Sequence, residues 1–70
     1  MEQDILEQKA QKILSSMISI HDLSDEDLRT IFAYDMWRDG MEWEDVKEIE
    51  SDPFWNREYI IAYLQDIFGY

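Results

Sequence analysis

The sequence contains no cysteine, one proline, two glycines and one histidine among its 70 residues. Without cysteine, a disulfide framework, a thiolate metal site and a cysteine nucleophile are excluded, and a reducing cytoplasm is the expected location. No apolar run approaches the roughly 18 residues that span a bilayer. The acidic beginning, Met1-Glu2-Gln3-Asp4, is unlike the positively charged start of a signal peptide. We therefore expect a small soluble protein.

Basic residues are also scarce, because six lysines and arginines stand against seventeen acidic residues and give a net charge of −11. A surface of this charge repels the phosphate backbone of nucleic acids. The chain is nevertheless 46% hydrophobic and 14% aromatic, far more than a disordered acidic tail contains. We therefore predict one folded domain over residues 1–70.

Hydrophobic residues recur at helical spacing in two segments of the N-terminal half. The first segment, from about Gln3 to Ile20, is expected to form an amphipathic helix. The second helix should begin after Ser24, a capping residue followed by three acids, and end near Arg38, because Gly40 follows where a left-handed C-cap is expected. The expected core residues are Leu6, Ala10, Ile13, Leu14, Met17 and Ile20 of the first helix and Leu28, Ile31, Phe32 and Met36 of the second.

Two further helices are predicted in the C-terminal half. A short helix from Met41 to Glu50 should turn Val46 and Ile49 inward. The last helix should begin at Asp52-Pro53, a capping side chain before a proline, and end near Phe68. Its expected core residues are Ile60, Ile61, Leu64, Ile67 and Phe68, while Trp55, Tyr59 and Tyr63 recur every four residues on a separate aromatic face. The expected fold is all-α, a small bundle of three main helices plus one short helix.

Residues 28–50 combine a helix that ends at Gly40, an apolar Met41 and a short helix that opens with Trp43. This pattern resembles the helix-turn-helix of homeodomain-like and transposase-type DNA-binding proteins, and it implies a helix-turn-helix-like arrangement here. That family contacts DNA through basic and amide side chains. Residues 42–52 carry six acids and only one base, Lys47. We therefore expect no direct nucleic-acid binding.

The net negative charge increases along the chain, from −1 over residues 1–20 to −4 over residues 21–40 and −6 over residues 41–70, where large aromatic residues accompany the acids. Carboxylates three or four positions apart on a helix lie roughly 5–6 Å from each other. Aromatic anchors beside steering charges are typical of protein interfaces. The predicted partner-binding residues are Glu42, Trp43, Glu44, Asp45, Glu48, Glu50, Asp52, Trp55, Tyr59 and Tyr63. The alternative is an acidic face that only confers solubility, with tryptophans in the core.

Short length, strong acidity and lack of cysteine make the chain similar in character to small phage or plasmid proteins that imitate DNA. The tripeptide Glu50-Ser51-Asp52 also resembles the acidic loop start of phage inhibitors of uracil-DNA glycosylase. These resemblances imply an inhibitor that binds a basic nucleic-acid-binding protein of restriction, defence, repair or transcription. The alternative is a regulatory or dimerisation module derived from a helix-turn-helix, which docks through Trp55, Tyr59 and Tyr63.

Catalysis and metal binding find little support in the sequence. Asp35 falls in the apolar stripe of the second helix, where a buried carboxylate needs a partner such as His21, a lysine or an arginine. Asp22, Ser24 and His21 include the residue types of a hydrolase triad, but they are nearly adjacent at a helix start. The run from Asp22 also lacks the glycine and glutamate of an EF-hand loop. We expect no catalytic residue, no metal and no cofactor.

Overall fold

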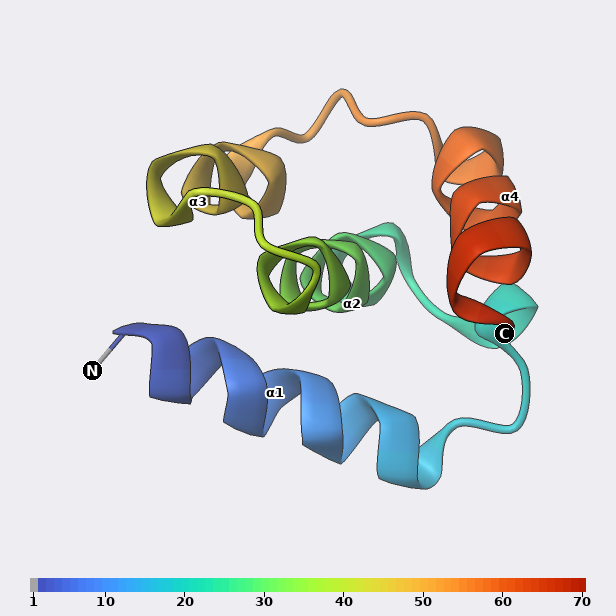
Figure 1. Cartoon of the computed structure of the whole chain (residues 1–70). Coiled ribbons are helices and arrows are strands. Elements are labelled where there is room, and N and C mark those ends of the chain that lie inside the picture. Colours follow the sequence, from blue (N-terminus) through green and yellow to red (C-terminus); the bar gives the residue numbers. More distant parts are fainter. Residues whose placement is uncertain (1) are drawn as a thin grey trace.

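The computed structural model describes residues 2–70, which form four α-helices and one short 3₁₀ helix, without a strand (Figure 1). The elements in chain order are α1 (Glu2–Ser16), η1 (Ile20–Asp22), α2 (Asp25–Arg38), α3 (Trp43–Ser51) and α4 (Arg57–Phe68). The prediction of an all-α bundle with three main helices and one short helix is confirmed. Across residues 2–70, no helix has the length and apolar composition needed to cross a bilayer.

Helix α2 is the centre of the bundle, because α1, α3 and α4 all pack against it (Figure 1). Every residue from Thr30 to Asp35 is buried, so α2 has no broad solvent-facing side along this stretch. This explains why its apolar residues are not confined to one stripe of the sequence. The buried hydrophobic core contains Leu6, Ala10, Ile20, Leu28, Ile31, Phe32, Ala33, Tyr34, Val46, Ile49, Ile60, Ile61 and Leu64.

Both ends of α2 lie where the sequence predicts them. The Ser24 hydroxyl accepts a hydrogen bond from the Asp27 backbone N–H at 3.1 Å and so caps the helix. At the other end, Gly40 has a φ of +107°, a conformation that glycine adopts without strain. The N–H of Gly40 bonds the Trp37 carbonyl and the N–H of Met41 bonds the Met36 carbonyl, the paired bonds of a Schellman cap. The chain then turns into α3.

The predicted extension of the first helix to Ile20 is wrong, because α1 ends at Ser16. The hydroxyls of Ser15 and Ser16 both donate to the Lys12 carbonyl, and such side-chain bonds compete with continued helix. Ser19 then accepts a hydrogen bond from the backbone of His21 and caps η1. Ile20 is buried as predicted, but from this 3₁₀ turn rather than from α1.

The predicted start of the last helix at Asp52-Pro53 is also wrong, because α4 begins at Arg57. Asp52 is the C-cap of α3, and its carboxylate accepts the Phe54 backbone N–H at 2.9 Å to form a local turn. Asn56 caps α4 instead, by accepting the Tyr59 N–H at 3.1 Å. The four-residue difference leaves the chain between α3 and α4 as an irregular connection over residues 52–56.

Two smaller details of the C-terminal half also differ from expectation. Ile67 is 58% exposed rather than part of the core, although the neighbouring Phe68 is half-buried. Helix α4 ends at Phe68 with Gly69 in the left-handed conformation, as expected. Helix α3 begins two residues later than predicted, at Trp43, and turns Val46 and Ile49 into the core.

Arg57 ties the start of α4 to the segment that precedes α2. Its guanidinium donates to the carbonyls of Leu23 at 2.6 Å and His21 at 2.7 Å, and it pairs with the Asp25 carboxylate at 3.0 Å. Hydrogen bonds from a charged donor contribute more than neutral ones. The exposed carboxylate of Asp25 should add little, since solvent screens such pairs.

Replacing Arg57 by methionine should lower the free energy of unfolding by about 1–3 kcal/mol, because two backbone carbonyls lose a charged donor. Asp25→Asn should cost less than about 1 kcal/mol. Lys12→Met removes the same charge from an exposed site on α1 and serves as the control. Urea denaturation followed by circular dichroism measures all three. Equal losses for Arg57→Met and Lys12→Met would show that the network does not hold α4.

Candidate functional site

Helix α3 presents two chemically different sides. Asp45 and Glu48, with Asp52 just beyond the helix, line a groove on the side toward α4. Lys47 and Glu50 lie on the side toward α1. This division follows from the helical repeat, since residues three and four apart share a face. The predicted acidic residues are therefore split between two surfaces.

The groove between α3 and α4 has a volume of about 420 Å³ and is open to solvent. One wall is acidic and belongs to α3 and its C-terminal end. The opposite wall is aromatic and belongs to α4 and the connection that precedes it. The floor is apolar and comes mainly from α2 and the turn that follows it. The lining residues are Asp45, Glu48 and Asp52 on the acidic wall, Trp55, Tyr59 and Tyr63 on the aromatic wall, and Phe32, Met36, Met41 and Ile49 on the floor.

The aromatic wall rests on the buried ring of Phe32. This ring makes edge contacts with Trp55 and Tyr63, each with centroids 5.3 Å apart, and with Tyr59 at 6.5 Å. Tyr59 also lies 5.9 Å from Trp55 and 6.1 Å from Tyr63, with ring planes tilted by 31° and 34°. Such packing holds the rings in place. Trp55 belongs to the aromatic wall although it precedes α4, and Tyr59 remains 52% exposed.

No basic side chain of residues 2–70 forms an ion pair with the acidic wall. No basic residue lines the groove, and within residues 2–70 neither Asp45 nor Glu48 forms an ion pair. The Asp52 carboxylate is held by the Phe54 N–H, and the Phe54 ring itself is 89% exposed beside the groove. An apolar floor next to unpaired carboxylates can bind a group that is both hydrophobic and cationic.

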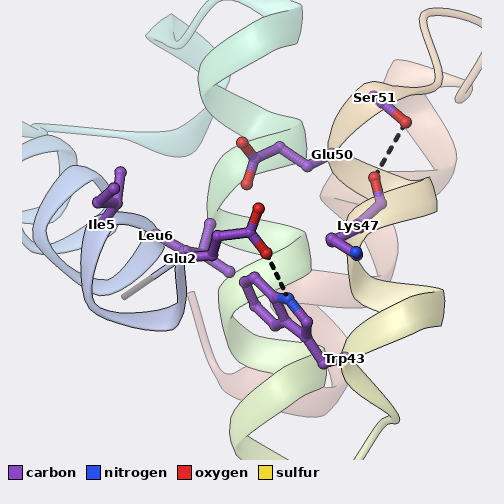
Figure 2. Close-up of a pocket in the computed structure, with 7 residues that line it drawn as sticks. All are labelled: Glu2, Ile5, Leu6, Trp43, Lys47, Glu50 and Ser51. Atoms are coloured by element: carbon purple, nitrogen blue, oxygen red, sulfur yellow. Dashed lines mark hydrogen bonds between the residues drawn. The ribbon is translucent and has the colours of Figure 1, made fainter.

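Trp43 and Glu50, both predicted partner-binding residues, lie outside this groove. Figure 2 shows them with Glu2 at a separate cavity of about 250 Å³ between α1 and α3. The Trp43 indole donates to the Glu2 carboxylate at 3.1 Å and packs edge-on against Trp37 at 5.9 Å. Glu50 pairs with Lys9 at 3.7 Å. On this side of α3 the acidic groups therefore have partners.

Glu42 and Glu44, the remaining predicted residues, line neither cavity. Glu42 is the exposed N-cap residue of α3 and makes no side-chain capping bond, and Glu44 is exposed in the first turn. Six of the ten predicted residues thus meet at the groove, and four lie elsewhere. The sequence pattern predicts Phe32, Met36 and Ile49 only as core residues, so it does not indicate that they also form the floor of the groove.

Asp35 lies away from the groove, at the ends of α2 and α4, and is 3% exposed. The expected arginine partner is Arg38, whose guanidinium is 3.9 Å from the carboxylate. His21, the other candidate, contacts Gln65 instead. Burial raises the pKa of Asp35, and the nearby Tyr70 hydroxyl and Arg38 charge oppose this rise. The buried Oδ2 atom of Asp35 has no hydrogen-bond partner among the described residues.

The raised pKa of Asp35 predicts a pH-dependent effect on stability. The folded protein binds this proton more strongly than the unfolded chain, so the contribution is complete below the unfolded pKa of 3.8 and is lost as pH rises through the folded pKa. Asp35→Asn should therefore be more stable than the parent protein at pH 7, and this advantage should shrink as pH falls toward 4. Urea denaturation at both pH values measures it.

Asp39→Asn provides the control, because it removes an exposed carboxylate from the adjoining turn of the chain. It relieves the same general repulsion without changing a buried group. If both variants gain the same stability at pH 7, burial of Asp35 is not the cause.

Among the side chains of residues 2–70, no three metal-ligating groups converge as a cation site. Comparisons with protein-family models, with curated proteins and with solved structures find no match for this chain. The groove with its acidic and aromatic walls is the site from which a function can be argued.

Proposed function

We propose that the protein is a small cytoplasmic inhibitor that binds a basic nucleic-acid-binding protein and presents carboxylates where that target binds phosphates. The observation that supports this most directly is the acidic wall of the groove, formed by Asp45, Glu48 and Asp52 without a basic partner. Like charges three or four residues apart destabilise a helix. Their presence on one wall is explained if a cationic surface neutralises them in a complex.

The density and placement of these charges suit binding to the basic surface with which the target protein binds a nucleic acid. Carboxylates at these spacings stand about 5–6 Å apart, so they form a line of negative charge. Exposed Glu42 and Glu44 extend the field around the start of α3. Duplex DNA is likewise a line of closely spaced negative charges. Such a field speeds encounter with a basic partner, and the neighbouring rings supply contact area.

A second candidate function is supported by the exposed aromatic groups. Phe54 is 89% exposed and Tyr59 is 52% exposed, side by side at the end of the groove. Under this proposal the chain is a regulatory module of helix-turn-helix ancestry that docks through its aromatic wall. Charge would then contribute little to binding, which separates the two functions experimentally.

The inhibitor proposal is tested with the immobilised protein and a nuclease-treated bacterial lysate. Captured nucleic-acid-binding proteins should be displaced by duplex DNA at constant ionic strength, because DNA and carboxylates compete for one basic surface. The double variant Asp45→Lys/Glu48→Lys should reduce capture about tenfold or more. Mass spectrometry and quantitative blotting of the eluates measure both effects.

The matched control is Asp4→Lys/Glu7→Lys, which changes the net charge equally on the exposed face of α1. It should alter capture much less, provided that circular dichroism shows both variants folded. Captured proteins that DNA fails to displace would refute mimicry. Loss of capture in Tyr59→Ala, with normal capture by the lysine variant, would favour the regulatory module instead.

A further inference from the structure

We infer that the groove between α3 and α4 receives an arginine-bearing amphipathic helix of the target protein. This inference rests on the proposed function for the existence of a protein target, and it adds the chemical group that the groove recognises. It is carried by three features of the groove: its apolar floor, its uncompensated acidic wall and its aromatic wall.

The floor fits the apolar face of a helix. Helices α3 and α4 both pack on α2 but leave part of the surface between them open, where a further helix can pack onto the bundle. Met36 and Met41 are only partly buried in this floor. Methionine side chains adapt to the shape of an incoming apolar group, and they are common at helix-binding surfaces.

The acidic wall favours a cationic occupant over a neutral or anionic one. The only base of α3, Lys47, lies on the opposite side of the helix, at the cavity shown in Figure 2. On that side the chain itself supplies Lys9 to pair with Glu50. On the groove side, Asp45 and Glu48 have no such partner within residues 2–70. A cation from another molecule can form the ion pairs with Asp45 and Glu48 that the chain itself does not provide.

The aromatic wall favours arginine over lysine. A guanidinium is planar, stacks on tyrosine rings and bonds a carboxylate through two parallel N–H groups, whereas an ammonium ion is a compact charge without this planar fork. The same chemistry already occurs within this protein at another place. The Arg38 guanidinium lies 5.4 Å from the Tyr34 ring centroid and 3.9 Å from the Asp35 carboxylate. The groove offers the tyrosine and the carboxylates without the arginine.

The test uses the full chain and a synthetic helical peptide of about 14 residues, the length at which isolated helices begin to form. The peptide carries leucines on one face with arginines beside them, and lysine and glutamine versions match it otherwise. Calorimetry gives the affinity, and ¹H–¹⁵N NMR follows the three indole N–H signals. Trp55 reports on the groove, while Trp37 and Trp43 lie together near the other side of α3.

The arginine peptide should shift the Trp55 indole signal and bind about threefold or more tightly than the lysine peptide. The glutamine peptide should bind most weakly. Asp45→Asn/Glu48→Gln should weaken binding of the arginine peptide about tenfold, because each lost carboxylate removes a charge-assisted bond. The control Glu44→Gln/Glu50→Gln removes the same charge from α3 outside the groove and should change the affinity less than about twofold.

Tyr59→Leu tests the aromatic contribution separately, since its side chain is half-exposed. It should reduce the preference for arginine over lysine while the leucine face still binds, because the carboxylates still accept bidentate bonds from a guanidinium. Equal loss of peptide affinity in the two double carboxylate variants would overturn the assignment of the groove as the binding site. Shifts of the Trp37 and Trp43 signals as large as that of Trp55 would overturn it as well. Either result would leave the inhibitor proposal standing, which fails only if DNA does not displace the captured target.

Discussion

The burial of α2 by three other helices is the constraint on which the rest of the structure depends. Because residues 30–35 are all buried, α1, α3 and α4 must share the circumference of one helix. Helices α3 and α4 therefore pack on different sides of α2. The irregular connection at residues 52–56 joins them (Figure 1). A small core supplies only a few kcal/mol of net stability, so the fold depends on the packing around α2. The open groove is the consequence of packing three helices on one.

The two sides of α3 show how the chain treats its negative charge. Toward α1, the Glu50 carboxylate pairs with Lys9 and the Glu2 carboxylate accepts the Trp43 indole N–H. Toward α4, Asp45 and Glu48 face an apolar floor and aromatic rings with no basic side chain among the lining residues. Helix α3 thus has one face on which the carboxylates have partners and one face on which they have none. Solubility alone would not require this difference, because any exposed acid serves that purpose.

Local sequence signals predicted the helix ends correctly where the capping residue takes part in only one helix end. Ser24 caps the start of α2 and Gly40 takes the left-handed conformation after its end, as expected. The signal failed at Asp52, whose carboxylate closes a turn with Phe54 after α3 and so cannot start α4. The site was predicted in part. Helical spacing identified the acids and rings, but which face of α3 is covered by α1 and which lines the groove depends on how the helices pack, and the sequence pattern does not specify that.

The negative charge of the groove opposes its contact with a second copy of the same chain. Exposed rings such as Tyr59 and Phe54 would favour self-association if they stood alone. Each copy, however, carries a net charge of −11 and places three carboxylates beside those rings. Two such surfaces repel each other and would bury unpaired charge on contact, whereas a cationic helix gains from both the charge and the apolar floor. Under the proposed function, the same carboxylates attract a basic partner and keep the aromatic wall free for it.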